Sequence, residues 1–288
     1  MKASLRKVSL SLLVVIAMGL GTYAHAEYAT PEKAAVQADA APSAPPAGMK
    51  LIPADLIADL NVSFYSQYIW RGFELSRDSL VIFPQLTVGY KGFAVTTWVD
   101  LDTRFSGADK KEFKLQETDV IASYSNSFKK LNYTLGWILY DFQPTTGQPD
   151  AENNRINDTK NQELFVTLGL DTLLKPTFSV YNEIEIGQAW YFTLGVSHSF
   201  AVYKDWSLDL AGMVSYMHDK SNANFGNLHD GNISAGLKIP LNSYLSIKPN
   251  LQYSFPLSSD AARQIRNSSF DGHHNNFVYG GLILDVAI

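Results

Sequence analysis

Charged side chains recur at every second position along several stretches of this sequence, between apolar neighbours. The acidic members are Asp100, Asp102, Glu117, Asp119, Glu163, Glu183 and Glu185, and the basic members are Arg71, Lys91, Arg104, Lys238 and Lys248. Because side chains of a β-strand point alternately to opposite faces, such residues would share one face of a sheet. On the inner face of a closed sheet they would line a lumen, where carboxylates attract cations.

The order of these residues along the chain predicts how their charges are distributed. The acidic residues fall on the third to seventh candidate strands, and most of the basic ones fall on the first two and on the tenth and eleventh. Opposed walls of unlike charge would set a transverse field across a pore and favour cations near the acidic wall. The alternative is that the charged groups pair and fill the lumen, as side chains do in barrels of about eight strands. The candidate pairs join Arg71 or Arg104 to Asp100, Asp102 or Glu117.

The period of the apolar residues predicts the elements that position these groups. Between Tyr244 and Phe255, apolar and polar residues alternate, which is the period of a strand and not of a helix. Twelve such stretches occur, at 59–71, 80–91, 92–104, 115–127, 131–142, 161–171, 178–187, 189–200, 206–217, 231–240, 244–255 and 277–288. An even number of antiparallel strands is typical of bacterial outer-membrane proteins. The sequence therefore predicts an all-β fold, an antiparallel transmembrane β-barrel of about twelve strands.

The links between the strands support this topology. Links near Lys91–Gly92 and at 127–130, 171–177, 201–205 and 241–243 are short, whereas those at 105–114, 143–160, 218–230 and 256–276 are longer and polar. Short periplasmic turns and longer external loops would give this alternation, with both chain ends in the periplasm. The links 72–79 and 187–189 are expected to be short outer exceptions. Pro84 and Pro249 stand inside strands, where each removes a ladder donor, so a local bulge is expected at each.

Aromatic residues fall near the ends of the predicted strands, on the apolar face. The predicted membrane-interface residues are Tyr68, Trp70, Tyr90, Phe93, Trp190, Trp206 and Tyr216. Two belts of this kind match the two interfaces of a bilayer. The alternative is a soluble sandwich or lipocalin-like barrel with its apolar face inward, which alternation alone does not exclude.

The first residues predict the compartment. Three basic residues precede an apolar stretch from Val8 to Leu20, and small residues follow, so residues 1–26 are expected to be a secretory signal peptide. Without it the chain carries 20 Lys and Arg against 28 Asp and Glu, a formal charge of −8, which argues against a nucleic-acid partner. Residues 27–57 are rich in Ala and Pro and are expected to form a flexible periplasmic leader. Residues 58–288 would form the barrel, and the absence of Cys excludes disulfides and thiolate chemistry.

Residues 63–103 read SFYSQYIWRGFELSRDSLVIFPQLTVGYKGFAVTTWVDLDT, and this stretch resembles the bacterial family of TorF-type porins. The matching residues are Tyr68, Trp70, Arg71, Gly72, Gly89, Gly92 and Trp98, which cover the first two or three strands. The resemblance implies an outer-membrane barrel and a pore, with no catalytic residues. The chain departs from the common pattern of such barrels at Ile288, because outer-membrane barrels usually end on an aromatic residue.

The alternatives to a channel are a lipid hydrolase, a metal site in a loop and a scaffolding barrel. An outer-membrane lipid hydrolase would need a nucleophile beside His198 or Asn182, but Ser197 and Ser199 alternate to the opposite face. Loop metal sites would draw on His273 and His274 with Asp271, His218 with Asp219, or His229 with Asp230, at spacings that match no ligand motif. A scaffolding barrel whose leader binds a periplasmic partner is a further alternative, which the sequence neither supports nor excludes. The sequence predicts a weakly cation-selective channel for small hydrophilic solutes or ions, surrounded by outer-membrane lipid. It predicts no catalytic residue, metal or cofactor, and leaves the oligomeric state open.

Overall fold

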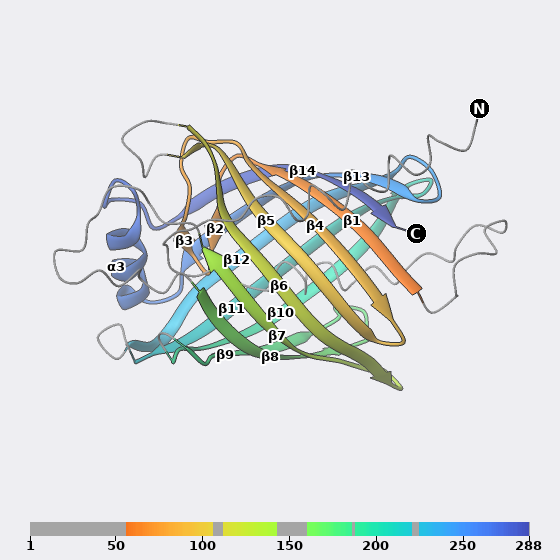
Figure 1. The fold of residues 1–288 in the computed structure, drawn as a ribbon, viewed down its shortest axis with the longest axis horizontal. Helices are drawn as coiled ribbons and strands as arrows, with labels where there is room; N and C mark the ends of the chain where they lie inside the picture. The colour runs from red at the N-terminus through yellow and green to blue at the C-terminus, as the bar shows by residue number, and fades with distance from the viewer. Residues whose placement is uncertain (1–55, 106–111, 143–159, 186–187, 221–224, 288) are drawn as a thin grey trace, which may run out of the picture.

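In the computed structural model, residues 56–105, 112–142, 160–185, 188–220 and 225–287 are described, and they form a closed barrel of twelve antiparallel strands (Figure 1). The wall strands are β1 (Leu56–Tyr65), β4 (Val81–Tyr90), β5 (Phe93–Phe105), β6 (Glu112–Phe128), β7 (Leu131–Phe142), β8 (Lys160–Leu170), β9 (Thr177–Glu183), β10 (Trp190–Tyr203), β11 (Trp206–Asp219), β12 (Phe225–Pro240), β13 (Leu245–Pro256) and β14 (Phe277–Ala287). The predicted signal peptide, and the predicted leader up to residue 55, lie outside the described residues.

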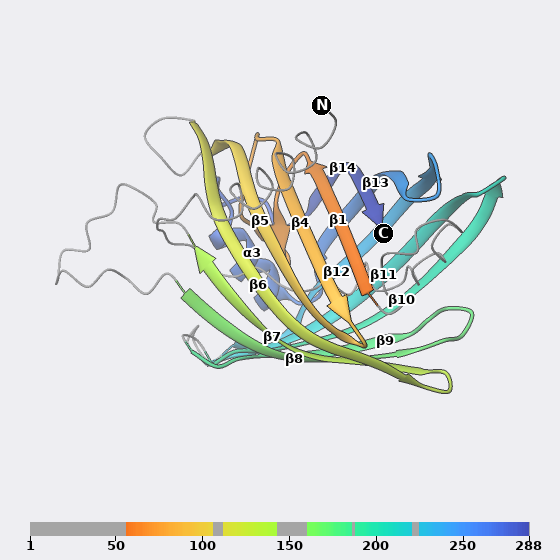
Figure 2. The ribbon, with the colours of Figure 1, turned by 45° about the vertical axis from the view of Figure 1, so that its right-hand side comes forward.

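Each wall strand pairs with its neighbour in the chain, and β1 closes the barrel by pairing with both β14 and β4. β1 begins and β14 ends at the same end of the barrel (Figures 1 and 2). We call this the turn end, because the short turns at 90–93, 128–131 and 203–206 lie there, and the opposite end the loop end.

Alternation decides which side chains face inward. On β8, Leu164, Val166 and Leu168 are 50%, 46% and 39% exposed, whereas Glu163 and Phe165, which alternate with them, are buried. The exposed apolar residues stand on the outer surface, because in a barrel successive side chains point alternately out and in. The prediction of a twelve-stranded antiparallel barrel is thus confirmed.

One helix, α3 (Ser259–Ser268), lies at the loop end between β13 and β14 (Figure 1). The Ser258 hydroxyl caps it by accepting from the Ala261 amide at 3.1 Å, which satisfies one of the free N–H groups of the first turn. Ala261 and Ile265, one turn apart, form its buried face. Of the helices in the described ranges, none is long and apolar enough to cross a membrane.

The structure corrects two details of the prediction. The first strand ends at Tyr65 instead of continuing to Arg71. Pro84 and Pro249 cause no bulge, because Pro84 faces Val62 and Pro249 faces Leu282 in unbroken register. The missing proline N–H therefore removes a hydrogen bond from the ladder without inserting a residue. The register shifts lie elsewhere, between β5 and β6, β10 and β11, and β11 and β12.

Candidate functional site

Residues 66–80 leave the wall after β1 and turn into the interior before β4 begins. We call them the inward hairpin. They contain the short strands β2 (Ile69–Trp70) and β3 (Phe73–Glu74), which pair with each other and lie within the outline of the barrel in both views (Figures 1 and 2). Arg71 and Gly72 connect them with φ of +44° and +81°, so the turn has positive φ at both central residues, as tight hairpin turns with the favoured twist do.

Arg71 at the tip of the hairpin forms the central contact with the wall. Its Nη2 lies 3.0 Å from both carboxylate oxygens of Glu163 on β8, and both side chains are almost fully buried. The guanidinium lies over the rings of Trp70, Tyr181 and Tyr191, at 4.7, 5.5 and 4.2 Å from their centroids. A buried charge is tolerated when it is paired and bonded, and this arrangement supplies both conditions.

Further polar contacts attach the hairpin to the same side of the wall. The Tyr68 hydroxyl donates to Glu117 Oε2 at 2.9 Å, and the Tyr68 ring packs against Phe83 and Trp98. The Ser79 hydroxyl donates to Asp102. The loop-end half of the barrel is therefore a packed interior.

The acidic residues named from the sequence collect in this half. Asp100, Asp102, Glu117, Asp119, Glu163 and Glu183 are all buried, at 1–5% exposure. Each lies near the end of its strand that faces the loops, on β5, β6, β8 or β9. Glu183 accepts bonds from the Asn161 amide and the Ala189 N–H. These six residues, which we call the acidic belt, thus lie beside the inward hairpin at the loop end of one side of the barrel, instead of running the length of that wall.

The turn-end half has a different lining. Hydroxyl pairs join adjacent strands there, for instance Thr167 with Ser179 at 3.0 Å and Thr87 with Thr96 at 2.8 Å. Lys238 and Lys248, on β12 and β13, are half-buried in this half, and Lys248 Nζ lies 2.7 Å from Asp209 Oδ2. The two lysines are separated from the acidic belt along the barrel axis as well as across it.

Three predicted lumen residues lie elsewhere. Lys91 is exposed in the β4–β5 turn with φ of +50°, and its Nζ lies 5.1 Å from the Tyr90 ring centre. Glu185 follows the end of β9, is exposed and accepts from Gln162 Nε2 at 2.8 Å. Arg104 is exposed at the loop end of β5. Each stands at or beyond a strand end, where alternation no longer fixes direction.

Two of the predicted interface aromatics do not lie on the outer surface. Tyr68 and Trp70 are 2% and 3% exposed inside the barrel, because the chain has left the wall before reaching them. The other five lie on the wall strands: Tyr90, Phe93, Trp190 and Tyr216 are exposed and Trp206 is half-exposed. Sequence reasoning missed the interior aromatics Phe165, Tyr181 and Tyr191, whose ring contacts link β8, β9 and β10.

A second network ties the inward hairpin to the loop that carries α3. Arg77 Nε lies 2.6 Å from Glu74 Oε1, and its Nη1 lies 2.6 Å from Asp271 Oδ2. The Phe270 N–H donates to the other Glu74 oxygen at 3.0 Å, and His274 Nδ1 lies 2.5 Å from Asp271. The Arg77 guanidinium, with bonds from the backbone N–H groups that follow, holds the pKa of Asp271 well below its ordinary 3.8.

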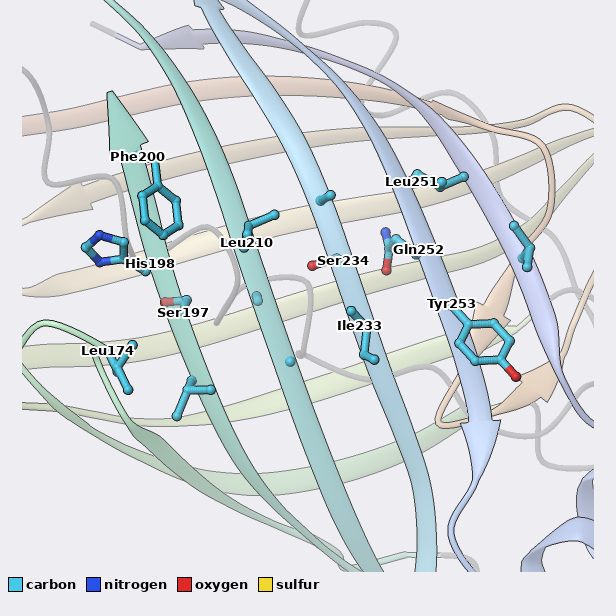
Figure 3. Close-up of a pocket in the computed structure, with 15 residues that line it drawn as sticks. Leu174, Ser197, His198, Phe200, Leu210, Ile233, Ser234, Leu251, Gln252 and Tyr253 are labelled. Carbon is cyan, nitrogen blue, oxygen red and sulfur yellow. The ribbon is translucent and has the colours of Figure 1, made fainter. Parts of the chain in front are cut away.

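Two of the histidines considered for other chemistry lie in different places: His198 is on the outer surface, whereas His229 is buried, with its Nδ1 3.0 Å from Asp230 Oδ1 and its Nε2 without a hydrogen-bond partner in the described residues. A hollow of about 510 Å³ on the outer surface spans β10 to β14 and includes His198 and Leu210 (Figure 3). His198 Nδ1 lies 2.7 Å from the Leu173 carbonyl oxygen, and Leu210 faces it across the ladder. Ser199 bonds Asp209 on the other side of the sheet. In the described part of the chain, no group of three His, Asp or Glu residues is arranged to hold a metal ion.

Comparison with known proteins gives one family and several structural likenesses. The model of a family described as a bacterial protein of unknown function (Gcw_chp) matches residues 54–240. No curated protein matches the chain.

Similar solved structures include a NanC porin, at 9% identity and a TM-score of 0.48 over 80% of this chain and 98% of that one. They also include OmpT, an outer membrane protein of Vibrio cholerae, at 8% identity and a TM-score of 0.36 over 81% of this chain and 98% of that one. An anion-selective porin from Comamonas acidovorans is 8% identical, with a TM-score of 0.31 over 81% of this chain and 98% of that one.

Proposed function

Because the chain belongs to the Gcw_chp family of bacterial proteins of unknown function, we propose its function from the geometry of its barrel. It is an outer-membrane, porin-like channel for passive diffusion of small hydrophilic solutes or ions, with a weak cation preference. The observation that carries this proposal is a closed wall whose outer face is apolar and whose inner face carries polar and charged side chains, with hydroxyl pairs at the turn end.

The outer surface is suited to lipid. Large apolar side chains are exposed on strand after strand, for instance Val95 at 53%, Leu135 at 48%, Leu194 at 55% and Ile233 at 56%. An apolar surface that encircles a protein is unfavourable in water, and a closed barrel satisfies its backbone hydrogen bonds within a bilayer. We place the turn end in the periplasm, with the leader, and the exposed aromatics at the membrane interfaces. The family that the comparison shows is Gcw_chp, and the resemblance to TorF-type porins stays a prediction.

The interior offers a hydrophilic route with a negative section. In the proposed channel, a solute that enters from the turn end passes hydroxyls and the Lys248–Asp209 pair and then approaches the acidic belt, whose carboxylates are buried beside the inward hairpin. Carboxylates in a confined space attract cations, and the buried guanidinium of Arg71 offsets part of their charge. The cation preference is therefore weak, and the passage is narrow beside the hairpin. The same arrangement supports a non-enzymatic role.

One observation favours a second candidate. The loop-end half is packed with aromatic side chains, including Trp98, Tyr140 and Phe165. A barrel filled permanently at one end would be a structural or scaffolding protein without transport.

Planar-bilayer recording separates the two candidates. Purified protein is inserted into a bilayer with a KCl gradient, and the conductance steps and the reversal potential are measured. A channel gives discrete steps and a small potential of the sign expected for cations. Asp119→Asn, in the acidic belt, should reduce that potential, whereas Asp141→Asn, beside Lys160 at the rim, should leave it unchanged. No steps, or a clear anion preference, would contradict the proposal.

A further inference from the structure

The inward hairpin is attached to the wall mainly through side chains. Among the described strands, β2 and β3 pair only with each other. Backbone bonds fix the segment near its two ends, where the Ser66 N–H donates to the Gly280 carbonyl and the Thr103 N–H to the Leu80 carbonyl, each at 3.0 Å. The residues between these points can therefore move without breaking the barrel ladder.

The tip of the hairpin reaches across the lumen. Glu163 lies on β8, which is separated from β4 along the wall by β5, β6 and β7. The Arg71–Glu163 ion pair is thus a tie between the hairpin and a distant part of the wall. Tyr140 on β7 reinforces it by donating its hydroxyl hydrogen to Glu163 Oε2 at 2.8 Å.

The backbone at Arg71 is held in a conformation that its residue type disfavours. A φ of +44° places a non-glycine residue in the left-handed region, at some energetic cost. Such residues persist when their surroundings fix them, and they cluster at switch regions. Arg71 Nε has no hydrogen-bond partner in the described residues, so opening would hydrate this group as well as both charges.

We infer that the inward hairpin is a gate that swings away from the wall, and that the Arg71–Glu163 ion pair holds it closed. The inference rests on the proposed channel, whose passage the hairpin would control. Loss of one partner leaves the other charge buried and unpaired, which disfavours the closed arrangement. Opening replaces the lost partner with water, so the closed population falls when either charge is removed.

Cysteine labelling measures this opening directly, because the chain has no natural Cys. Ser76→Cys places a thiol in the hairpin at a position that is 2% exposed. The full-length protein in liposomes is treated with a charged, water-soluble methanethiosulfonate, and the labelling rate is followed. Adding Glu163→Gln should raise the rate about tenfold or more, since a local opening controls access to a buried thiol.

Two controls separate gate opening from general loosening. Asp141→Asn is the matched variant: it also neutralises a carboxylate, but Asp141 lies at the rim, where its Oδ2 is 3.6 Å from Lys160 Nζ on β8. It should leave the Ser76→Cys rate unchanged. Ser179→Cys, buried in the wall, should be labelled slowly with and without Glu163→Gln.

If Glu163→Gln prevents folding, Tyr140→Phe tests the same contact more gently, and it should raise the rate by a smaller factor. An unchanged Ser76→Cys rate in the folded variant, or an equal rise at Ser179→Cys, would overturn the gate. Labelling does not depend on current. A labelling response without conductance would support the gate and refute the channel, and conductance without a labelling response would refute the gate alone.

Discussion

At the scale of single residues, the acidic belt is stable because specific donors reach it. Glu163 accepts hydrogen bonds from Arg71 and Tyr140, and Glu117 accepts one from Tyr68. The sequence predicted these carboxylates at inward positions, since they alternate with the side chains of the predicted outer face. It did not indicate the Arg71–Glu163 pair, because the two residues are 92 positions apart and lie on elements whose relative placement no local pattern fixes.

Tyr68→Phe tests the value of one such donor. The change leaves the ring against Phe83 and Trp98 and removes only the hydroxyl that donates to buried Glu117. Hydrogen bonds to charged groups contribute roughly 1.5–3 kcal/mol, so the free energy of unfolding should fall by about that amount. Urea unfolding in detergent, followed by tryptophan fluorescence, measures it. Tyr90→Phe, on an exposed ring, is the control and should change it by less than about 0.5 kcal/mol.

Asp271 gives a pH-dependent prediction outside the membrane-spanning strands. Its pKa is lowered by Arg77, so the charged form stabilises the folded state above the ordinary pKa of 3.8. This contribution is lost as the pH falls below that value and the carboxylate is protonated. Wild type should therefore be more stable than Asp271→Asn near neutral pH, and the difference should shrink in acid below about pH 4. Unfolding curves across this range would contradict the account if the difference stayed constant.

At the scale of elements, the alternation of apolar residues predicted all twelve wall strands, and it failed where the chain leaves the wall and at several strand ends. Tyr68 and Trp70 continue the alternation of β1, so the periodic pattern extends into the inward hairpin. Their side chains lie in the apolar interior of the barrel and not in lipid. Alternation with a period of two does not distinguish these two environments. One feature of the sequence could have predicted the inward hairpin. Between Trp70 and Phe73 stand two residues, and a glycine such as Gly72 in a two-residue turn is typical of a hairpin.

The closing seam between β1 and β14 depends on Gly281. A Cβ at this position would collide with the Phe64 carbonyl oxygen, which belongs to the backbone of β1 and cannot rotate away. Gly281→Ala should therefore weaken barrel closure, visible as loss of the heat-modifiable folded band on gels. Gly212→Ala is the matched change, since the nearest atom to its Cβ would be 3.8 Å away. Equal behaviour of the two variants would show that the seam tolerates the added methyl group.

At the scale of the whole molecule, the distribution of charge differs from the predicted transverse walls. The acidic residues gather at the loop end, where the hairpin supplies their donors, and Lys238 and Lys248 lie toward the turn end. Strand order along the chain fixes the position of a residue around the barrel, and the buried acidic residues lie on β5, β6, β8 and β9. Position along the axis depends on stagger and on the hairpin, which the sequence pattern did not reveal.

The central claim is that solutes pass through the barrel interior while the outer face contacts lipid. Thr167 and Leu168 are adjacent on β8, and alternation points the first inward and the second outward. In the cysteine-free chain, Thr167→Cys and Leu168→Cys are each treated with the same bulky thiol reagent during single-channel recording. We predict that modification at position 167 lowers the conductance and that modification at position 168 leaves it unchanged. Equal effects at the two positions, or a reduction only at position 168, would contradict the account.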